Sequence, residues 1–552
     1  GKELKKRRTF WNQINDYNLW RVFWTAAQPS SGANPNNENV VTRRSDADNQ
    51  SRSVKREIES VENGSVREGY HTMCVVLHDK DADVVEARAG HVAAVINSLG
   101  FSTIIESDNL ASAFRGSWPG HGTENVRRAL FNTRHFARLW PTSTKWQGSE
   151  KAPCPFFPAN SGPLLITRTT GGSPYFFNVH KHDLGNFLLV GPSGYGKSYA
   201  VGSLAMAFLQ YPGAKVRILD RDAAQIVPTL ACGGEFYDAH TLHYAPLAHV
   251  DEEAERGWAL RFLETLAGLR NFQMTPQART DLTRALEILA TRKPKQRTMT
   301  HFLGQLQTHS EGLKDALRYY TLGNGGAIID GDPGVIGHAR WQTYDMQEVL
   351  GKGEEISTPV IMHLIHEMHR DMDGSPFLLI AEEGWQAAGN EYLQDATEEG
   401  SANFRKKNAA MGIVLHSPAN LMEWDRQDLL RVNLGTMIFL PNEQATSTGA
   451  HGLQDHYLSL GLTTRDCELL AAGMRPRRDY FCVQGENRRV FQLDSGPLAH
   501  AILSVNGRDA APRVVELMQQ QGELWVPAWL HETGHKELAL QWLQRQHIKE
   551  AA

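Results

Sequence analysis

Hydrophobic and polar residues follow two alternating patterns along most of the chain. Short, almost uninterrupted apolar runs, such as those at 186–190 and 376–381, are typical of strands buried on both faces of a parallel sheet. Between them lie longer segments with the length and apolar spacing of packed helices, for example 198–209. This alternation predicts an α/β fold built around a largely parallel sheet.

The α/β pattern is interrupted once and ends before the chain does. We expect the core of the fold to comprise residues 186–250 and 326–496. Between these two stretches, residues 251–325 have almost no strand character and predict an all-helical insertion. Residues 497–552 predict a helical C-terminal tail, in which Trp525 and Trp529 are aromatic anchors.

The first part of the chain has a different texture. Residues 1–65 combine charged helical segments with a polar loop or linker rich in Asn, Ser and Asp. Because the chain opens on Gly1 with helical character rather than on Met, we expect residues 1–65 to be the end of a longer N-terminal domain. Residues 151–185 predict a linker rich in Pro and Gly, followed by short strands.

A small separate module is expected at 66–150. Strand-like runs at 70–77 and 100–106 enclose a helical stretch at 82–99, and a further short helix follows. This order predicts a small α+β module of the ferredoxin-like kind.

Charge and cysteine usage limit the classes of function. The 552 residues include 57 basic and 62 acidic ones, so the net charge of −5 provides no global basic field for nucleic acid. Five scattered cysteines without a C-x-x-C pair indicate reduced thiols in a cytosolic protein. No apolar run reaches the ~18 residues of a membrane helix, which predicts a soluble or peripherally attached protein.

The most specific motif is GPSGYGKS at 191–198, which fits the phosphate-binding loop G-x-x-x-x-G-K-[ST] and lies between a predicted strand and a predicted helix. Its glycines let the backbone turn N–H groups toward phosphate oxygens at a helix N-terminus. Lys197 is expected to reach the β- and γ-phosphates, and the Ser198 hydroxyl to ligate Mg²⁺. The predicted ATP-binding residues are Gly191, Pro192, Ser193, Gly194, Tyr195, Gly196, Lys197 and Ser198. The alternative, an ordinary glycine-rich turn, does not explain the strand and helix on either side.

A second half-site follows the apolar run at 376–381. Its strand delivers Glu382 and Glu383 at the carboxyl end. We expect Glu382 to hold Mg²⁺ through water and Glu383 to orient the water that attacks the γ-phosphate. The usual order at such a site is Asp followed by Glu, so Glu382 is a departure.

Three further positions are candidates for the same site. Asp220 and Asp222 follow a predicted strand, so either carboxylate is a candidate for approaching the nucleotide or Mg²⁺, and a salt bridge with Arg221 is an equally weighted alternative. His416 lies at the tip of another strand, where a γ-phosphate sensor is expected.

No arginine lies within the phosphate loop, although an arginine directed at the γ-phosphate accelerates phosphoryl transfer. Arg405 is the leading candidate for a residue acting in trans on the neighbouring subunit, with Arg478 as the second. The alternative for Arg405 is a surface residue packed by its own helix.

Two histidine patterns imitate metal sites. Residues 531–535, HETGH, match the zinc-protease signature, but Gly534 inside the motif disfavours the regular helix that this site needs. His363, His366 and His369 lie on one predicted helix without a cysteine or carboxylate set to complete a site. We therefore expect no zinc.

With these residues in view, the chain resembles the conjugative type IV secretion ATPases of the TrbE/TraC kind, within the FtsK/HerA group of RecA-like motors. The resemblance covers nearly all of residues 69–530. It rests on Pro119-Gly120, Asn125-Val-Arg-Arg128, Trp146-Gln-Gly148, Asn178-Val-His180, Asp183-Leu-Gly185, the GPSGYGKS loop, Asp220-Arg-Asp222, Gly233-Gly234, Glu382 to Trp385, Arg405-Lys-Lys-Asn408 and Trp525 to Leu530. Two positions depart from the family pattern, which has Asp at Glu382 and Gln at His416.

The resemblance implies a RecA-like P-loop NTPase domain and a hexameric, cytoplasmic ATPase associated peripherally with the bacterial inner membrane. Its implied partners are other type IV secretion components, and its implied work is pilus assembly or the transfer of a protein or DNA substrate. The residues alone indicate a Mg²⁺-dependent ATP hydrolase. Two alternatives remain open: a DNA translocase of the same superfamily, and a nucleotide-gated assembly scaffold with weak hydrolysis, which the departures at Glu382 and His416 suggest.

Overall fold

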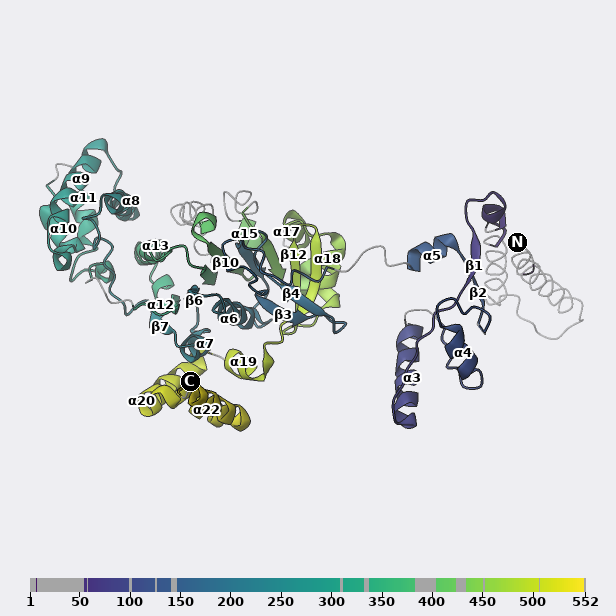
Figure 1. Ribbon diagram of the computed structural model, residues 1–552. Helices are drawn as coiled ribbons and strands as arrows, with labels where there is room; N and C mark the ends of the chain where they lie inside the picture. Colours follow the sequence, from purple (N-terminus) through teal and green to yellow (C-terminus); the bar gives the residue numbers. More distant parts are fainter. Residues whose placement is uncertain are drawn as a thin grey trace, which may run out of the picture. The chain divides into compact units, whose positions relative to one another are not determined.

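The computed structural model describes residues 6, 54–56, 58–98, 102–124, 127–139, 146–307, 311–331, 337–382, 404–422, 433–449, 452–505 and 507–550. The chain divides into two compact units, Gly1–Lys145 and Trp146–Ala552. The boundary lies close to the predicted end of the small module at residue 150. Each unit is described by itself, and Figure 1 shows both.

The first unit contains a small two-stranded sheet. Strand β1 (Glu68–His71) pairs antiparallel with β2 (Ala129–Asn132), and the helices are α3 (Ala82–Ser98), α4 (Leu110–Gly116) and α5 (Thr133–Leu139). The helix predicted at 82–99 is confirmed. The strand predicted at 70–77 ends at His71, and residues 102–106 form no strand.

The absence of a strand at 102–106 has a visible physical correlate. Ile104 and Ile105 are 61% and 60% exposed, so no neighbouring strand or helix in the described part of this unit covers them. The described part of the first unit therefore lacks the four-stranded sheet that the ferredoxin-like prediction requires.

The second unit is built on an 11-stranded sheet of order β4-β3-β13-β12-β11-β5-β10-β9-β6-β8-β7. The part from β11 to β7 is parallel throughout, and the remaining strands add antiparallel at one side. The parallel strands are β5 (Phe187–Val190), β6 (Lys215–Asp220), β7 (Glu235–Asp238), β8 (Trp341–Asp345), β9 (Phe377–Glu382), β10 (Ala409–Leu415) and β11 (Thr436–Phe439). The antiparallel strands are β3 (Leu165–Arg168), β4 (Pro174–Phe177), β12 (Asp479–Gln484) and β13 (Asn487–Gln492). The predicted α/β core is confirmed.

The central strands are apolar because both faces of the sheet are covered. In β5, Leu188 and Val190 enter one hydrophobic core, while Phe187 and Leu189 enter the core on the other face. Gly412 of β10 lies opposite Phe187, and a Cβ atom at this position would lie 2.3 Å from the phenyl ring. This glycine therefore provides the space that the Phe187 ring fills.

The predicted helical insertion is confirmed between β7 and β8. It consists of α8 (Glu253–Leu269), α9 (Pro276–Ala290), α10 (Met299–Gln305) and α11 (Leu313–Arg318). The N-terminus of α9 is capped by Thr275, whose hydroxyl accepts a hydrogen bond from the Ala278 amide at 3.1 Å. Figure 1 shows these helices together, with α8 packed on α13 (Glu354–Arg370).

The C-terminal tail is helical, as predicted, and packs on the core. Its helices are α19 (Gly496–Leu503), α20 (Gly507–Gln521), α21 (Trp525–Glu532) and α22 (Lys536–Glu550). Trp525 and Trp529 are buried in a hydrophobic cluster that also contains Ile226 and Val227 of α7 (Ile226–Ala231). Figure 1 shows α20 beside α7. No helix among the described residues is long and apolar enough to cross a membrane.

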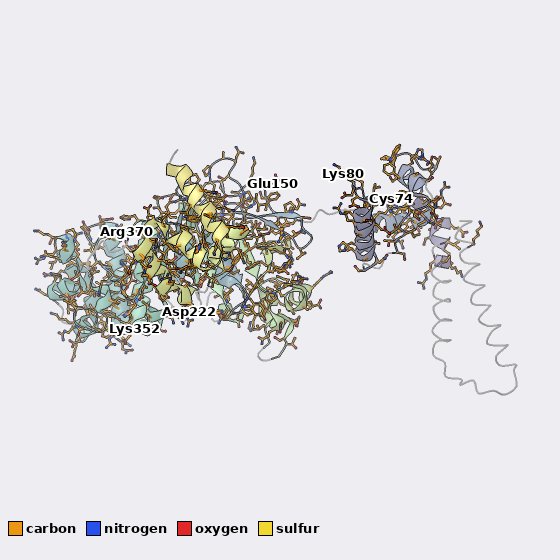
Figure 2. The ribbon with its side chains drawn as sticks, turned by 90° about the horizontal axis from the view of Figure 1, so that it is seen from below. Cys74, Lys80, Glu150, Asp222, Lys352 and Arg370 are labelled. Atoms are coloured by element: carbon orange, nitrogen blue, oxygen red, sulfur yellow. The ribbon has the colours of Figure 1, made fainter. Side chains whose placement is uncertain are left out.

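The histidines of α13 are packing residues rather than metal ligands. His363 is 5% exposed beside Tyr244, and the His366 ring stacks on Trp258 at 3.8 Å between centroids. His366 also hydrogen-bonds to Glu255 of α8 at 2.6 Å. Arg370, labelled in Figure 2, ends the helix. Among the described residues, no group of histidine, cysteine and carboxylate side chains is arranged to hold a metal ion.

Burial lowers the pKa of His363 from its ordinary value of 6.5 to about 3, and the nearby His366, His249 and Arg370 lower it further. Below pH 6.5 the unfolded chain therefore binds a proton that the folded chain does not. The stability that the neutral His363 provides is present above pH 6.5 and is lost as the pH falls toward 3.

We predict that His363→Leu makes the folded protein less sensitive to acid. From pH 6.5 to pH 5 the wild-type histidine costs about 2 kcal/mol of stability, at about 1.4 kcal/mol per pH unit, and leucine removes this loss. Thermal denaturation at pH 7 and pH 5 would measure the difference in melting temperature. His531→Leu, at an exposed position of α21, is the control and should keep the wild-type pH dependence. An unchanged difference in His363→Leu would contradict the prediction.

Candidate nucleotide site

The phosphate loop joins β5 to α6 (Lys197–Phe208), as predicted. The Gly191 amide donates to the Leu415 carbonyl of β10 at 3.1 Å, and a Cβ on Gly191 would lie 2.5 Å from Cβ of Leu440. Gly194 and Gly196 have φ values of +79° and +106°, a conformation that favours glycine. The loop thus has the glycine-dependent geometry that exposes N–H groups at the start of a helix.

Lys197 is held at the base of the loop. Its Nζ atom donates to the Gly191 carbonyl at 2.8 Å and lies 2.7 Å from Nδ1 of His416. An ammonium group only donates, so Nδ1 of His416 accepts in this contact. The Ser193 hydroxyl lies 3.2 Å from the same nitrogen. The structure therefore brings His416 to the phosphate loop, next to the lysine.

Sheet order explains this meeting. Strand β10 pairs in parallel with β5, with Leu415 opposite Val190, so the residue after Leu415 emerges beside the loop that follows Val190. On its other side β10 pairs with β9, with Val414 opposite Glu382. Glu382 thus ends the strand that is separated from β5 by β10 alone. Glu383, the predicted catalytic carboxylate, lies outside the described residues.

Asp220 is next to Glu382 at the carboxyl edge of the sheet. It is 1% exposed, and its two oxygens accept the backbone N–H groups of Arg221 and Gln225, each at 2.8 Å. Burial and the neighbouring Glu382 raise the pKa of Asp220 well above its usual range. Gln225 then donates from Nε2 to the Ser198 carbonyl at 2.9 Å. The turn after β6 is thereby connected to the predicted magnesium serine, whose own residue is exposed.

Asp222 is directed elsewhere. Its backbone and that of Ala223 are left-handed, with φ values of 67° and 52°, and its carboxylate pairs with Arg508 of α20. Figure 2 labels Asp222. Of the two aspartates considered from the sequence, Asp220 lies beside Glu382, and Asp222 binds the C-terminal tail.

Arg405 lies at the start of β10, far from the loop of its own chain. It forms a salt bridge with Asp183, which precedes β5. Because β5 and β10 are parallel, these two residues mark the edge opposite the phosphate loop. Arg478, the second candidate, has a guanidinium nitrogen 3.5 Å from Oε1 of Gln492.

Arg477 was not identified from the sequence as a site residue. Its Nε atom donates to the Gly194 carbonyl at 2.8 Å, from within the same chain. The basic cluster before β12 was visible in the sequence. Which of its arginines faces the loop depends on the position of β12 in the sheet, which the local sequence does not encode.

The zinc-protease match has no helical basis. Helix α21 ends at Glu532, and Gly534 has a φ of +89°, so His531 and His535 do not lie on one continuous helix. The geometry that places both imidazoles of H-E-x-x-H on one face is absent here.

Comparison with known proteins identifies the family. The chain is 30% identical over 480 residues to a probable conjugal transfer protein TrbE of Sinorhizobium fredii, covering 85% of this chain and 71% of that protein. The chain belongs to the TrbE family of conjugal transfer proteins. It is also 30% identical over 477 residues to the conjugal transfer protein TrbE of Rhizobium radiobacter, and 26% identical over 472 residues to the type IV secretion system protein virB4 of Bartonella quintana. These two alignments cover 84% and 82% of this chain, which spans 57% and 56% of the lengths of the two relatives. No family model matches the chain.

A solved structure supports the fold. The structure of VirB4 of Thermoanaerobacter pseudethanolicus aligns with a TM-score of 0.51 at 15% identity, covering 61% of this chain and 97% of that one. The expected RecA-like P-loop NTPase fold and the resemblance to TrbE-type proteins are both confirmed.

We predict that His416→Leu weakens the binding of a nucleoside triphosphate about 10-fold. Leucine removes the nitrogen that accepts from Lys197, and a hydrogen bond to a charged group contributes about 1.5 kcal/mol. Titration with a fluorescent ATP analogue would measure the affinity. His416→Gln is the matched control, because its amide oxygen can accept from the same donors, and it should bind within about 3-fold of wild type. If His416→Leu binds as tightly as wild type, the contact does not position Lys197.

Proposed function

We propose that this TrbE-family protein hydrolyses ATP with Mg²⁺ and drives pilus assembly or substrate transfer in a type IV secretion system. The observation that carries the proposal is the convergence at one sheet edge of Lys197, His416 and the strand that ends in Glu382. A phosphate loop alone supports nucleotide binding. The second strand with its carboxylates supports hydrolysis.

The residues of the loop fit a triphosphate. Gly194 and Gly196 leave the loop free of side chains where the backbone must approach phosphate, and a Cβ on Gly196 would lie 2.9 Å from the Tyr480 hydroxyl. Ser198, at the exposed start of α6, is the proposed Mg²⁺ ligand, and Glu382 is proposed to hold the metal through water. Bound Mg²⁺ would offset negative charge on the phosphates.

The protein's own groups divide the remaining work. Lys197 supplies positive charge to the β- and γ-phosphates, while the Gly191 carbonyl and His416 set its direction. His416 at the strand tip is proposed as the γ-phosphate sensor. Glu383 is proposed to orient the attacking water, since it directly follows the strand that ends at Glu382.

The oligomer and partners are proposed from the family. A hexamer would place Arg405 of one subunit at the site of the next, and association with other secretion components at the inner membrane would direct the work of hydrolysis. DNA that stimulates turnover, with the effect lost steeply as salt increases, would favour the translocase alternative. An intact oligomer that binds ATP without turnover would favour the nucleotide-gated scaffold.

Glu383→Gln tests the hydrolytic role. The amide keeps the size of the side chain but cannot accept the proton or orient water as a carboxylate does, so turnover should fall by at least about 100-fold. ATP binding, which depends on the phosphate loop, should stay within about 3-fold of wild type. Steady-state phosphate release and nucleotide titration would measure the two properties. Lys197→Ala is the contrasting variant and should weaken binding itself. Near wild-type hydrolysis by Glu383→Gln would reject the assignment.

Mixing two inactive variants tests whether Arg405 acts between subunits. Glu383→Gln and Arg405→Ala should each be inactive alone, because a missing arginine finger costs a factor of about 10³ to 10⁵. In mixed oligomers some interfaces combine an intact Glu383 with an intact Arg405, so activity should partly return. Phosphate release from verified mixtures would be the measurement. Full activity of Arg405→Ala alone would exclude it as the finger, and no recovery on mixing would exclude action across the interface.

A further inference from the structure

Three consecutive carbonyls of the phosphate loop accept hydrogen bonds from one short segment of the same chain. The Arg477 side chain donates from Nε to Gly194 at 2.8 Å, and the Arg477 amide donates to Tyr195 at 3.1 Å. The Tyr480 hydroxyl donates to Gly196 at 3.1 Å. We call residues 475–480, which lead into β12, the β12 clasp.

The clasp holds the outer side of the loop. A phosphate loop binds through backbone N–H groups that converge on one side. In a peptide unit the carbonyl points away from the N–H group, so carbonyls fixed on the outside keep the amides of the same peptide units directed inward. The clasp therefore restrains the half of each peptide unit that does not contact phosphate.

The clasp is itself rigidly supported. Arg477 has a left-handed φ of 60°, which costs about 1 kcal/mol for a non-glycine residue and needs support from its surroundings. The buried Asp479 provides that support: its Oδ2 accepts from the Arg475 amide at 2.9 Å, and its Oδ1 accepts from Gln492 of β13 at 2.8 Å. The Asp479 amide also donates to the Arg475 carbonyl at 3.0 Å.

Tyr480 ties the clasp to the hydrophobic core. Its residue is 1% exposed, and its ring lies 5.8 Å from that of Phe491. The ring is thus fixed while its hydroxyl reaches the loop. Arg477, by contrast, is exposed, so solvent and a bound nucleotide both have access to its guanidinium group.

We propose that Arg477 is a positioning residue, which together with Tyr480 holds the phosphate loop in its phosphate-accepting conformation within a single subunit. The proposal rests on the nucleotide-binding part of the proposed function. Because the clasp contacts Gly194, Tyr195 and Gly196 rather than the γ-phosphate, it serves ADP and ATP alike. Loop ordering before binding lowers the cost of binding, so the clasp acts on affinity rather than on the chemical step.

Arg477→Gly is the main test, because glycine keeps the left-handed backbone and the amide bond to Tyr195 while it removes the guanidinium. We expect the dissociation constants of Mg-ADP and a Mg-bound non-hydrolysable ATP analogue to rise by the same factor, about 5- to 10-fold. The KM for ATP should rise similarly, and kcat at saturation should stay within about 2-fold. Tyr480→Phe should give a smaller shift of the same kind. Arg477→Lys, which keeps a donor, should recover part of the affinity.

Arg475→Ala is the matched control, since this exposed residue lies in the same turn and serves it through its backbone. It should bind ADP as wild type does, and melting without nucleotide should be similar for all variants. If Arg477→Gly does not fold, Tyr480→Phe and Arg477→Lys carry the same test.

The outcomes separate the clasp from the motor proposal. Unchanged ADP affinity in Arg477→Gly and Tyr480→Phe, or a loss of kcat alone, would overturn the clasp and leave ATP hydrolysis standing. Wild-type protein that binds ADP but never hydrolyses ATP would overturn hydrolysis, while the ADP titrations would still decide the clasp. Wild-type protein that binds no nucleotide would overturn both.

Discussion

The insertion of β10 between β5 and β9 is the constraint on which the site depends. All three strands are parallel, so their carboxyl ends meet at one edge. The pairing is tight because Gly412 leaves room for the Phe187 ring, and a side chain there would force β10 away from β5. A displacement of β10 would separate His416 from Lys197 and would move Glu382 with it. Packing in the middle of the sheet therefore sets distances at its edge.

The same edge also collects the parts of the chain that lie outside the parallel core. The turn after β6 reaches α6 through Gln225 and reaches the C-terminal tail through Asp222 and Arg508. From the other side, the β12 clasp reaches the loop through Arg477 and Tyr480. The phosphate loop is thus bordered by a parallel strand, by a carboxylate turn and by an antiparallel addition to the sheet. A change in any of these three is transmitted to the loop by hydrogen bonds rather than by loose contact.

Local chemistry explains which parts the sequence could predict. Strands β5, β6, β9 and β10 were predicted because burial on both faces makes a strand continuously apolar, and the loop because its glycines and lysine are contiguous. The strand predicted at 100–106 was wrong in its described part: apolar residues alone do not make a strand without a partner, and Ile104 and Ile105 are exposed. Arg477 could not be singled out, because its contact with Gly194 spans 283 positions of sequence and depends on β12 joining the sheet beside β11. The fold class was therefore readable, whereas a contact set by sheet order was not.

The two arginines at the sheet have different places and so different chemistry. Arg477 is at the loop but uses its Nε on the Gly194 carbonyl, which fixes it to the backbone rather than to the γ-phosphate. Arg405 precedes β10, and the length of that strand, about 20 Å, separates it from the loop of its own chain, beyond the reach of one side chain. It is paired there with Asp183, which keeps its guanidinium at the opposite edge. One arginine is thus built into the loop's own support. The other acts on a phosphate only where a second subunit brings its site to that edge.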